Sequence, residues 1–132
     1  MVQPRLHRGR RDDALERLAA LSRLEPDWDS YGALPIAPVA LDTARSFVLT
    51  TVERFAEGNR DSAVPYTAMP IADGGVSLEW RGPRSSLELD IGPEGTLGYL
   101  LIEHTDGGRR FEEASDLTTE QAYDLIGRVV GA

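Results

Sequence analysis

Three stretches of the chain place apolar residues three or four positions apart, the spacing of an amphipathic helix. The first begins at Asp12, a suitable N-cap, and its leucines recur every three residues up to the next proline. The second begins at Pro38, a residue that favours the first helical turn, and ends at Gly58. The third begins at Thr118, which forms a capping box with Gln121.

Between these helices the pattern changes to strict alternation, which is the period of a strand with one buried face. Val64–Ile71 contains two prolines, so we expect an edge strand or an extended segment there. The following strands are expected at Val76–Arg81, Ser86–Ile91, Thr96–His104 and Arg109–Glu113. The face that the helices should cover consists of Val76, Leu78, Trp80, Leu87, Leu89 and Ile91.

The pattern therefore predicts an α+β fold. It has two N-terminal helices, a four- to five-stranded antiparallel meander sheet, and one C-terminal helix packed on one sheet face. At 132 residues the chain has the length of a single domain. Residues 1–11 contain four arginines and are expected to form a flexible basic tail, which leaves residues 12–132 as the domain.

Turn lengths predict which residues lie opposite each other in the sheet. The loop after the strand Val76–Arg81 places Glu79 opposite Glu88. The Asp106-Gly107 pair is typical of a type I′ hairpin turn and places Glu103 opposite Arg110.

For the intervening hairpin we predict a two-residue Glu94-Gly95 turn. That turn places Asp90 opposite Tyr99 and Glu88 opposite Leu101. Because neighbouring side chains in a strand point to opposite faces, the alternate residues would then point toward the helices. These are Gly98, Leu100 and Ile102.

This register predicts an outer sheet face rich in carboxylates, with Tyr99 and Leu101 as apolar anchors and Arg110 at one side. The carboxylates are Glu79, Glu88, Asp90, Glu103 and Glu112. Such a face is a solvated surface, a recognition surface for a basic partner, or a metal or catalytic cluster. An open face does not exclude water, which argues against catalysis because burial would then shift the carboxyl pKa values little.

The net charge is −8, and residues 12–132 carry 10 Arg against 22 acidic residues, a net of −12. A domain this acidic repels phosphate backbones, so we expect no nucleic-acid binding through it. The basic tail either contacts nucleic acid or an acidic partner, or is simply a solvated end. No stretch is long and apolar enough for a membrane span or a signal peptide, so we expect a cytoplasmic protein.

Catalytic and cofactor motifs are missing from the sequence. Without cysteine there is no thiolate metal site and no cysteine nucleophile, and the two histidines, His7 and His104, do not make a zinc site. No nucleotide-binding glycine loop and no nucleophile elbow occur. We therefore expect no catalytic residue, metal or cofactor, and favour a non-enzymatic protein.

The segment after the first helix, residues 25–38, holds the strongest candidate loop. Asp27, Asp29 and a glycine at the sixth position resemble the start of a calcium loop, but a proline stands where the final glutamate is required. The carboxylates either hydrogen-bond the backbone of the loop or hold a divalent metal or small ligand. Trp28 and Tyr31 are expected to dock the loop onto the domain, with Trp28 buried. If the loop binds a ligand, Tyr31, Asp27 and Asp29 should stay partly exposed.

Two motifs resemble a widespread family of short, uncharacterised bacterial and phage-associated proteins. They are Trp28-Asp29-Ser30-Tyr31-Gly32-Ala33 with Pro35-Ile36 and Pro38, and Asp73-Gly74-Gly75-Val76 with Leu78-Glu79-Trp80, followed by Leu87-Glu88-Leu89. The resemblance spans roughly residues 15–102. It implies no activity and no catalytic residues, and suggests genes that stand beside a second small gene.

Three hypotheses of function follow. The preferred one is a protein-interaction module, the neutralising or accessory member of a two-protein pair. The second is a small-ligand or metal-binding domain or enzyme that uses the Asp27–Tyr31 loop. The third is a homodimer joined through an edge strand or the outer face. The candidate binding residues are Asp27, Trp28, Asp29, Tyr31, Glu88, Asp90, Tyr99 and Leu101.

Overall fold

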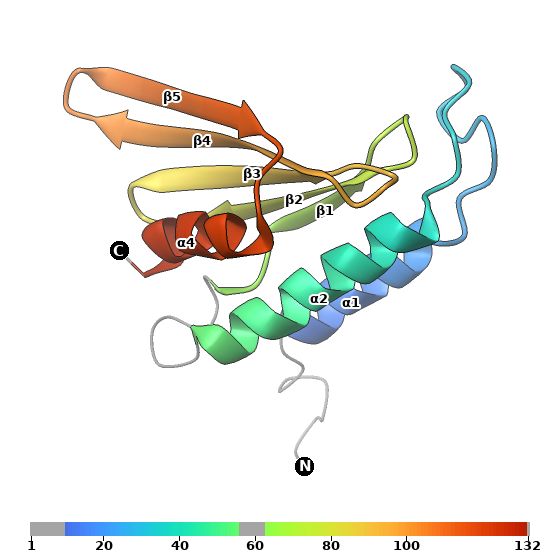
Figure 1. The fold of residues 1–132 in the computed structure, drawn as a ribbon, viewed down its shortest axis with the longest axis horizontal. Helices are drawn as coiled ribbons and strands as arrows, with labels where there is room; N and C mark the ends of the chain where they lie inside the picture. The colour runs from blue at the N-terminus through green and yellow to red at the C-terminus, as the bar shows by residue number, and fades with distance from the viewer. Residues whose placement is uncertain (1–9, 56–62, 132) are drawn as a thin grey trace, which may run out of the picture.

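The computed structural model describes residues 10–55 and 63–131, and it confirms the α+β fold (Figure 1). The helices are α1 (Arg10–Leu21), α2 (Pro38–Arg54) and α4 (Thr119–Val130). The strands are β1 (Thr67–Pro70), β2 (Val76–Arg81), β3 (Ser85–Ile91), β4 (Leu97–Thr105) and β5 (Gly108–Ser115). They form one antiparallel meander in chain order, with β1 at one edge and β5 at the other.

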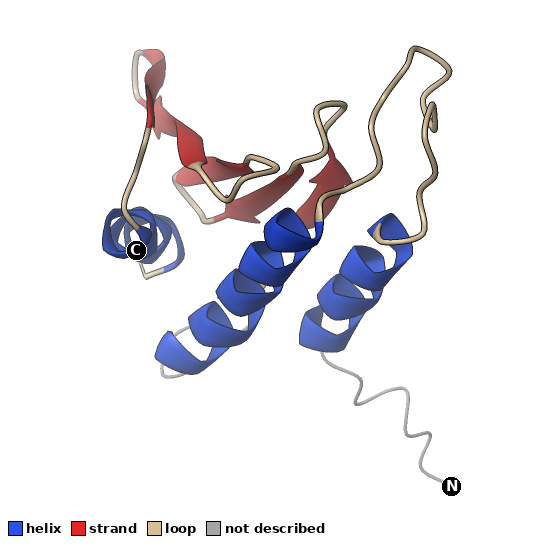
Figure 2. Cartoon of the chain, turned by 45° about the vertical axis from the view of Figure 1, so that its right-hand side comes forward, coloured by secondary structure: helices blue, strands red, loops and turns tan. Residues whose placement is uncertain are grey.

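The helices lie on one side of the sheet, so the domain has two layers (Figure 2). Both α2 and α4 pack on β2 and β3, while α1 packs on α2 and β1. The alternating apolar residues of β2 and β3 are completely buried beneath them, as predicted. We call this helix-covered side the inner face. None of the described helices covers the opposite side, which we call the outer face.

The helix ends agree with the sequence signals at two of the three helices. Thr118 Oγ1 accepts the N–H of Gln121 and the Gln121 side chain accepts the N–H of Thr118, which completes the predicted capping box. Pro38 stands in the first turn of α2, after Ala37 at the N-cap.

The first helix differs from the prediction at both ends. It begins at Arg10 rather than at an Asp12 N-cap, and it ends at Leu21. The longer start places two aspartates inside the first turn, where negative charge stabilises the helix dipole. Arg10 and Arg11, predicted to lie in the tail, are therefore helical. The second helix ends at Arg54, with Phe55 as its C-cap, and so ends before the predicted Gly58. Gly58 itself and the rest of the predicted tail lie outside the described residues.

The predicted register of β2 with β3 is confirmed. Trp80 lies opposite Leu87, and Glu79 lies opposite Glu88. On the inner face, the indole Nε1 of Trp80 donates to the backbone oxygen of Ala63 at 3.0 Å, so this buried ring has its hydrogen bond satisfied.

The predicted register of β3 with β4 is wrong by one residue. The connection is a five-residue loop at 92–96, in which Gly92 N–H donates to the Thr96 carbonyl at 2.8 Å, and not a two-residue turn. Leu89, rather than Asp90, therefore lies opposite Tyr99. Because the side-chain period is two, this single step moves every residue of β4 to the other face. Tyr99 and Leu101 point inward, and Gly98, Leu100 and Ile102 point outward.

The register of β4 with β5 is as predicted, with Glu103 opposite Arg110. The turn is not type I′, since neither Asp106 nor Gly107 has the positive φ that this type requires at both positions. Because β4 changes face, β5 changes with it. Glu103, Arg110 and Glu112 therefore lie on the inner side.

Candidate functional site

The outer face brings carboxylates and apolar side chains together from four neighbouring strands. Its carboxylates are Glu79 on β2, Glu88 and Asp90 on β3, and Glu113 on β5. Its apolar side chains are Leu100 and Ile102 on β4 and Phe111 on β5. Sequence reasoning correctly placed Glu88 and Asp90 here, but it placed Tyr99 and Leu101 here in error.

The carboxylates on β3 are electrostatically strained. Partial loss of water and the negative charges of Asp90 and Glu79 raise the pKa of Glu88, although its side chain remains exposed. One carboxylate oxygen of Asp90, Oδ1, is buried with no hydrogen-bond partner among the described residues. A positively charged group that approached this pair would stabilise its two negative charges.

On the β2 side, Arg81 balances the negative charge. Its Nε donates to Glu79 Oε2 at 2.9 Å, and its guanidinium lies 3.7 Å from the centre of the Tyr66 ring. Charge neutralisation is therefore local to Glu79. The unbalanced negative charge of the face remains on Glu88 and Asp90.

Gly98 leaves two adjoining open hollows on the outer face, because it stands between Asp90 and Ser115 without a side chain. One has a volume of about 260 Å³ and also reaches Asp73 and Asp116. The other has a volume of about 490 Å³ and reaches Glu113. Both hollows are bordered by carboxylates, so they favour cationic groups over anionic ones.

The apolar part of the face lies beside these carboxylates, toward the β5 edge. Ile102 lies opposite Phe111, whose side chain is 59% exposed. Leu100 lies between Glu88 and Glu113 in the neighbouring row. An exposed phenylalanine next to branched aliphatic side chains is typical of a surface that another molecule covers.

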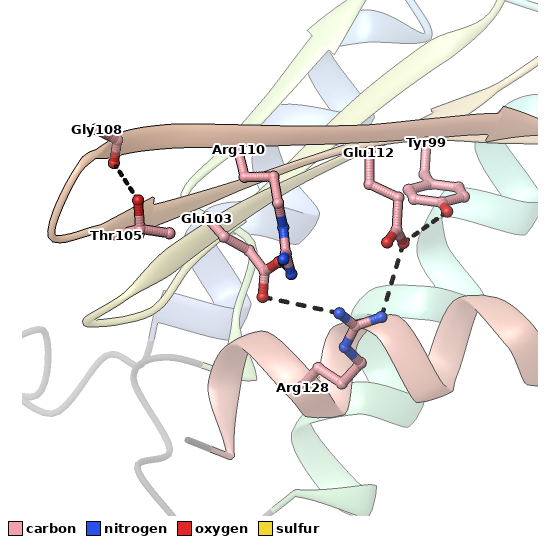
Figure 3. Close-up of polar contacts among 7 residues, drawn as sticks. All are labelled: Tyr99, Glu103, Thr105, Gly108, Arg110, Glu112 and Arg128. Carbon is pink, nitrogen blue, oxygen red and sulfur yellow. Dashed lines mark hydrogen bonds and ion pairs between the residues drawn. The ribbon is translucent and has the colours of Figure 1, made fainter.

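On the inner side, Tyr99 belongs to a polar network that ties the β4–β5 hairpin to α4 (Figure 3). Its hydroxyl donates to Glu112 Oε2 at 2.9 Å, and this hydrogen bond raises the pKa of Tyr99. Arg128 of α4 lies 3.7 Å from carboxylate oxygens of both Glu103 and Glu112. Arg110 donates to Glu103 at 2.6 Å. Tyr99 therefore has a structural role.

Leu101 is 1% exposed and belongs to the core. The sequence hypothesis that Tyr99 and Leu101 anchor a partner on the outer face is therefore wrong in its geometry. Their positions on that face are taken by Leu100 and Ile102, one residue away along β4.

The carboxylates of the 25–38 loop hydrogen-bond the loop's own backbone. Asp27 Oδ1 accepts the N–H of Gly32 at 2.6 Å. Asp29 Oδ1 accepts the N–H of Tyr31 at 2.8 Å and of Ala33 at 3.0 Å. These bonds hold a tight turn in which Asp27 has positive φ. The two aspartates therefore organise the backbone of the loop.

The two aromatic residues of the loop differ in their surroundings. Trp28 is half-buried, and its Nε1 donates to the backbone oxygen of Leu34 at 2.8 Å. Tyr31 is 91% exposed, so it does not dock the loop as expected. Trp28 fixes the loop, whereas Tyr31 is presented to solvent.

The two motifs that carry the family resemblance lie against each other. Leu34 N–H donates to the Ala72 carbonyl at 2.9 Å, and Ala37 N–H donates to the Gly74 carbonyl at 2.8 Å. A Cβ on Gly75 would lie 2.3 Å from the backbone oxygen of Ile91, which only glycine avoids. Close backbone packing thus accounts for much of both motifs.

Within residues 10–55 and 63–131, no three His, Asp or Glu side chains are grouped so as to hold a metal ion. In the same residues, no helix has both the length and the apolar character needed to span a bilayer. In comparisons with protein families, curated proteins and solved structures, the chain matches none of them. The family resemblance remains an expectation, and function must be argued from the site.

Sequence reasoning missed Leu100, Ile102 and Phe111 as surface residues. For β4 no signal was available, because both of its faces are apolar and either one could have been the buried one. For Phe111 a signal existed. It stands alone between two arginines and two glutamates, and a strand flanked by charge on both sides is an exposed strand.

Proposed function

We propose that this protein is a protein-interaction module that binds a basic partner protein on its outer sheet face. One observation carries the proposal: the exposed Phe111 and the half-buried Leu100 and Ile102 share the outer face with the carboxylates of Glu88 and Asp90. Interfaces commonly join an apolar, aromatic centre to a polar rim, and this face has both parts.

The chemistry of the partner follows from the charge. Glu88 and Asp90 lie two residues apart on one strand, and the pKa of Glu88 is raised because its charge is poorly stabilised. A lysine or arginine from a partner would stabilise both negative charges and could donate to the exposed Glu88 carboxylate. The net charge of −8 adds long-range attraction for a basic protein.

The apolar residues determine the size of the partner. A free cation or small amine would leave the aliphatic side chains of Leu100 and Ile102 without a contact. A protein that places aliphatic or aromatic side chains on β4 and β5 and a basic side chain over β3 would use the whole face. In a two-protein pair, this chain would be the neutralising or accessory member.

The alternative of a metal or small-ligand site at the Asp27–Tyr31 loop has less support. Asp27 and Asp29 already accept backbone hydrogen bonds within the loop. The hollows that reach the outer face lie at Gly98, and no residue of the loop lines them. The exposed Tyr31 remains a useful comparison site.

The test is affinity capture from host lysate with the tagged full-length chain, read by mass spectrometry and followed by titration of the purified partner. The outer-face variants are Glu88→Arg and Ile102→Ser. Asp124→Arg on α4 repeats the charge change on the helical layer, and Tyr31→Ala tests the loop.

The proposal predicts one stoichiometric basic protein that both outer-face variants lose and both controls retain, with affinity that falls as salt rises. Circular dichroism must show that all variants fold. A partner lost only with Tyr31→Ala would move the site to the loop. No partner, or one retained by both outer-face variants, would refute the proposal.

A further inference from the structure

The two edge strands of the sheet, β1 and β5, are protected to different degrees against pairing with a strand of another molecule. At β1, α1 packs alongside, Arg17 Nη1 donates to the Tyr66 backbone oxygen at 2.9 Å, and Pro70 ends the strand. At β5, all eight residues are exposed, and no proline interrupts them. A long open edge presents a row of backbone groups that another strand can pair with.

The hydrogen-bonding pattern shows which backbone groups of β5 point outward. His104 N–H donates to the Arg84 carbonyl on the β3 side, and the Leu97 carbonyl accepts from Leu117 on the β5 side. Even-numbered residues of β4 therefore bond to β3, and odd-numbered ones bond to β5. Their β5 partners are even-numbered, such as Arg110 and Glu112. The backbone groups of Arg109, Phe111 and Glu113 are thus directed to the open edge.

The charges of this strand are complementary to its own reversed sequence. It reads Arg109-Arg110-Phe111-Glu112-Glu113, with two positive charges, an aromatic ring and two negative charges. Antiparallel pairing of two copies about a two-fold axis through Phe111 places Arg109 opposite Glu113 and Arg110 opposite Glu112. We propose that the protein forms a homodimer by antiparallel pairing of β5 with β5 of a second copy in this register.

The backbone and the charges select the same register. Hydrogen-bonded pairs must join residues whose N–H and C=O groups point outward, so odd-numbered residues pair with odd-numbered ones. The neighbouring registers that satisfy this rule place Arg110 opposite Arg110, or Glu112 opposite Glu112, at the axis. Like charges directly opposite destabilise a ladder. Only the register centred on Phe111 opposes both arginines to both glutamates.

The side chains that would meet across the axis are available. Phe111 is 59% exposed, and Arg109 lies 5.8 Å from its ring centre on the same outer face. Among the described residues neither Arg109 nor Glu113 forms a salt bridge. On the inner side, Arg110 and Glu112 already contact Glu103 and Arg128, so the second copy would extend that network.

Pairing of this kind is isologous, with the same strand used by both copies. The two-fold axis would run perpendicular to the sheet, so both outer faces would lie on the same side of one continuous sheet. The two Phe111 rings would be neighbours at its centre. Phe111 belongs to both proposed surfaces, whereas Glu88 and Asp90 lie on β3, away from the open edge. Dimerisation is therefore measured with the purified chain alone, without the basic partner.

The first test measures the mass of the full chain by sedimentation equilibrium from about 1 µM to about 1 mM, a range that covers weak dimers. Arg109→Glu and Glu113→Arg each oppose like charges twice in their own homodimer. An equimolar mixture restores opposite charges at both places. We expect dimerisation to weaken roughly tenfold or more in each variant, and the mixture to recover it as a heterodimer.

The second test reads the register directly, because the chain has no cysteine. Phe111→Cys would place two cysteines opposite each other about 5.5 Å apart, within the range of a disulfide. Ala114→Cys would place its two cysteines roughly 20 Å apart. Under mild oxidation we expect a covalent dimer from the first variant and none from the second.

Three outcomes would overturn the inference. They are a wild-type chain that remains monomeric throughout the concentration range, charge variants that dimerise as the wild type does, and faster crosslinking of Ala114→Cys than of Phe111→Cys. Loss of dimerisation in Arg109→Glu with the basic partner still captured would support the inference and leave the proposed function unchanged, since Arg109 is not among the residues proposed to bind that partner.

Discussion

Replacing Glu88 by glutamine is expected to stabilise the fold at neutral pH, although it removes a charged surface residue. Glu88 lies directly opposite Glu79 on β2, and Asp90 lies next to it on the same face of β3. Partial burial and these two negative charges raise the pKa of Glu88. Glutamine keeps the shape of the side chain and removes the repulsion.

The magnitude follows from cross-strand pairs. Like charges opposite each other in a sheet cost about 0.2–1 kcal/mol. Because solvent screens the exposed Glu88, we expect glutamine to raise the free energy of unfolding by about 0.5 kcal/mol. The folded protein holds a proton on Glu88 more tightly than the unfolded chain does. Its free energy of unfolding therefore falls as pH rises from the ordinary value of 4.5 through the raised pKa. The gain from glutamine is complete above this window and absent below it.

Urea unfolding followed by circular dichroism, at about pH 7 and at about pH 4, measures this difference at one fixed protein concentration. Glu94→Gln makes the same change in the exposed loop after β3 and is the matched control. Equal or lower stability of Glu88→Gln than of the wild type at neutral pH would refute the electrostatic reasoning. So would a gain that persists unchanged at the acidic pH.

Three further substitutions test the geometry. Leu101→Glu should cost about 4 kcal/mol or more in the free energy of unfolding, or prevent folding, because it buries a charge. Ile102→Glu should cost only about 1 kcal/mol, because its cross-strand neighbours are Ser86 and Phe111; equal costs would contradict the register of β4. Gly75→Ala should lower the free energy of unfolding, measured by thermal denaturation, by about 2 kcal/mol or more, because the added Cβ would clash with the Ile91 backbone. Gly107→Ala should lower it far less, because its Cβ meets open space. Arg128→Met should speed hydrogen exchange of β5 amides while global stability falls by under about 1 kcal/mol; unchanged exchange would show that the network does not hold the hairpin.

The elements that sequence reasoning predicted well have strong local signals. Pro38 begins α2, and Thr118 with Gln121 begins α4, because these residues satisfy or tolerate the free N–H groups of a first helical turn. In β2 and β3 the strict alternation of apolar and charged residues left one face that could be buried. The pairing of Glu79 with Glu88 was also predicted correctly, from the length of the loop between these strands.

The site was predicted only in part, because it depends on the length of the loop between β3 and β4. Glu88 and Asp90 lie on the outer face as expected, but the anchors beside them depended on how many residues the loop at 92–96 contains. Thr96 accepts a hydrogen bond from Gly92, which widens the loop beyond the Glu94-Gly95 pair. One residue of register exchanged Leu101 for Leu100.

That ambiguity is itself an argument about function. A sheet with one solvated face should alternate between apolar and polar residues, as β2 and β3 do. In contrast, β4 has Leu97, Tyr99 and Leu101 on its inner face and also places Leu100 and Ile102 on its outer face. Helices cover only the first set. If solvent alone met the outer face, polar residues would serve there at less risk of aggregation. The sequence of β4 is that of a strand with two apolar faces, which supports the proposal that a partner protein covers the second one.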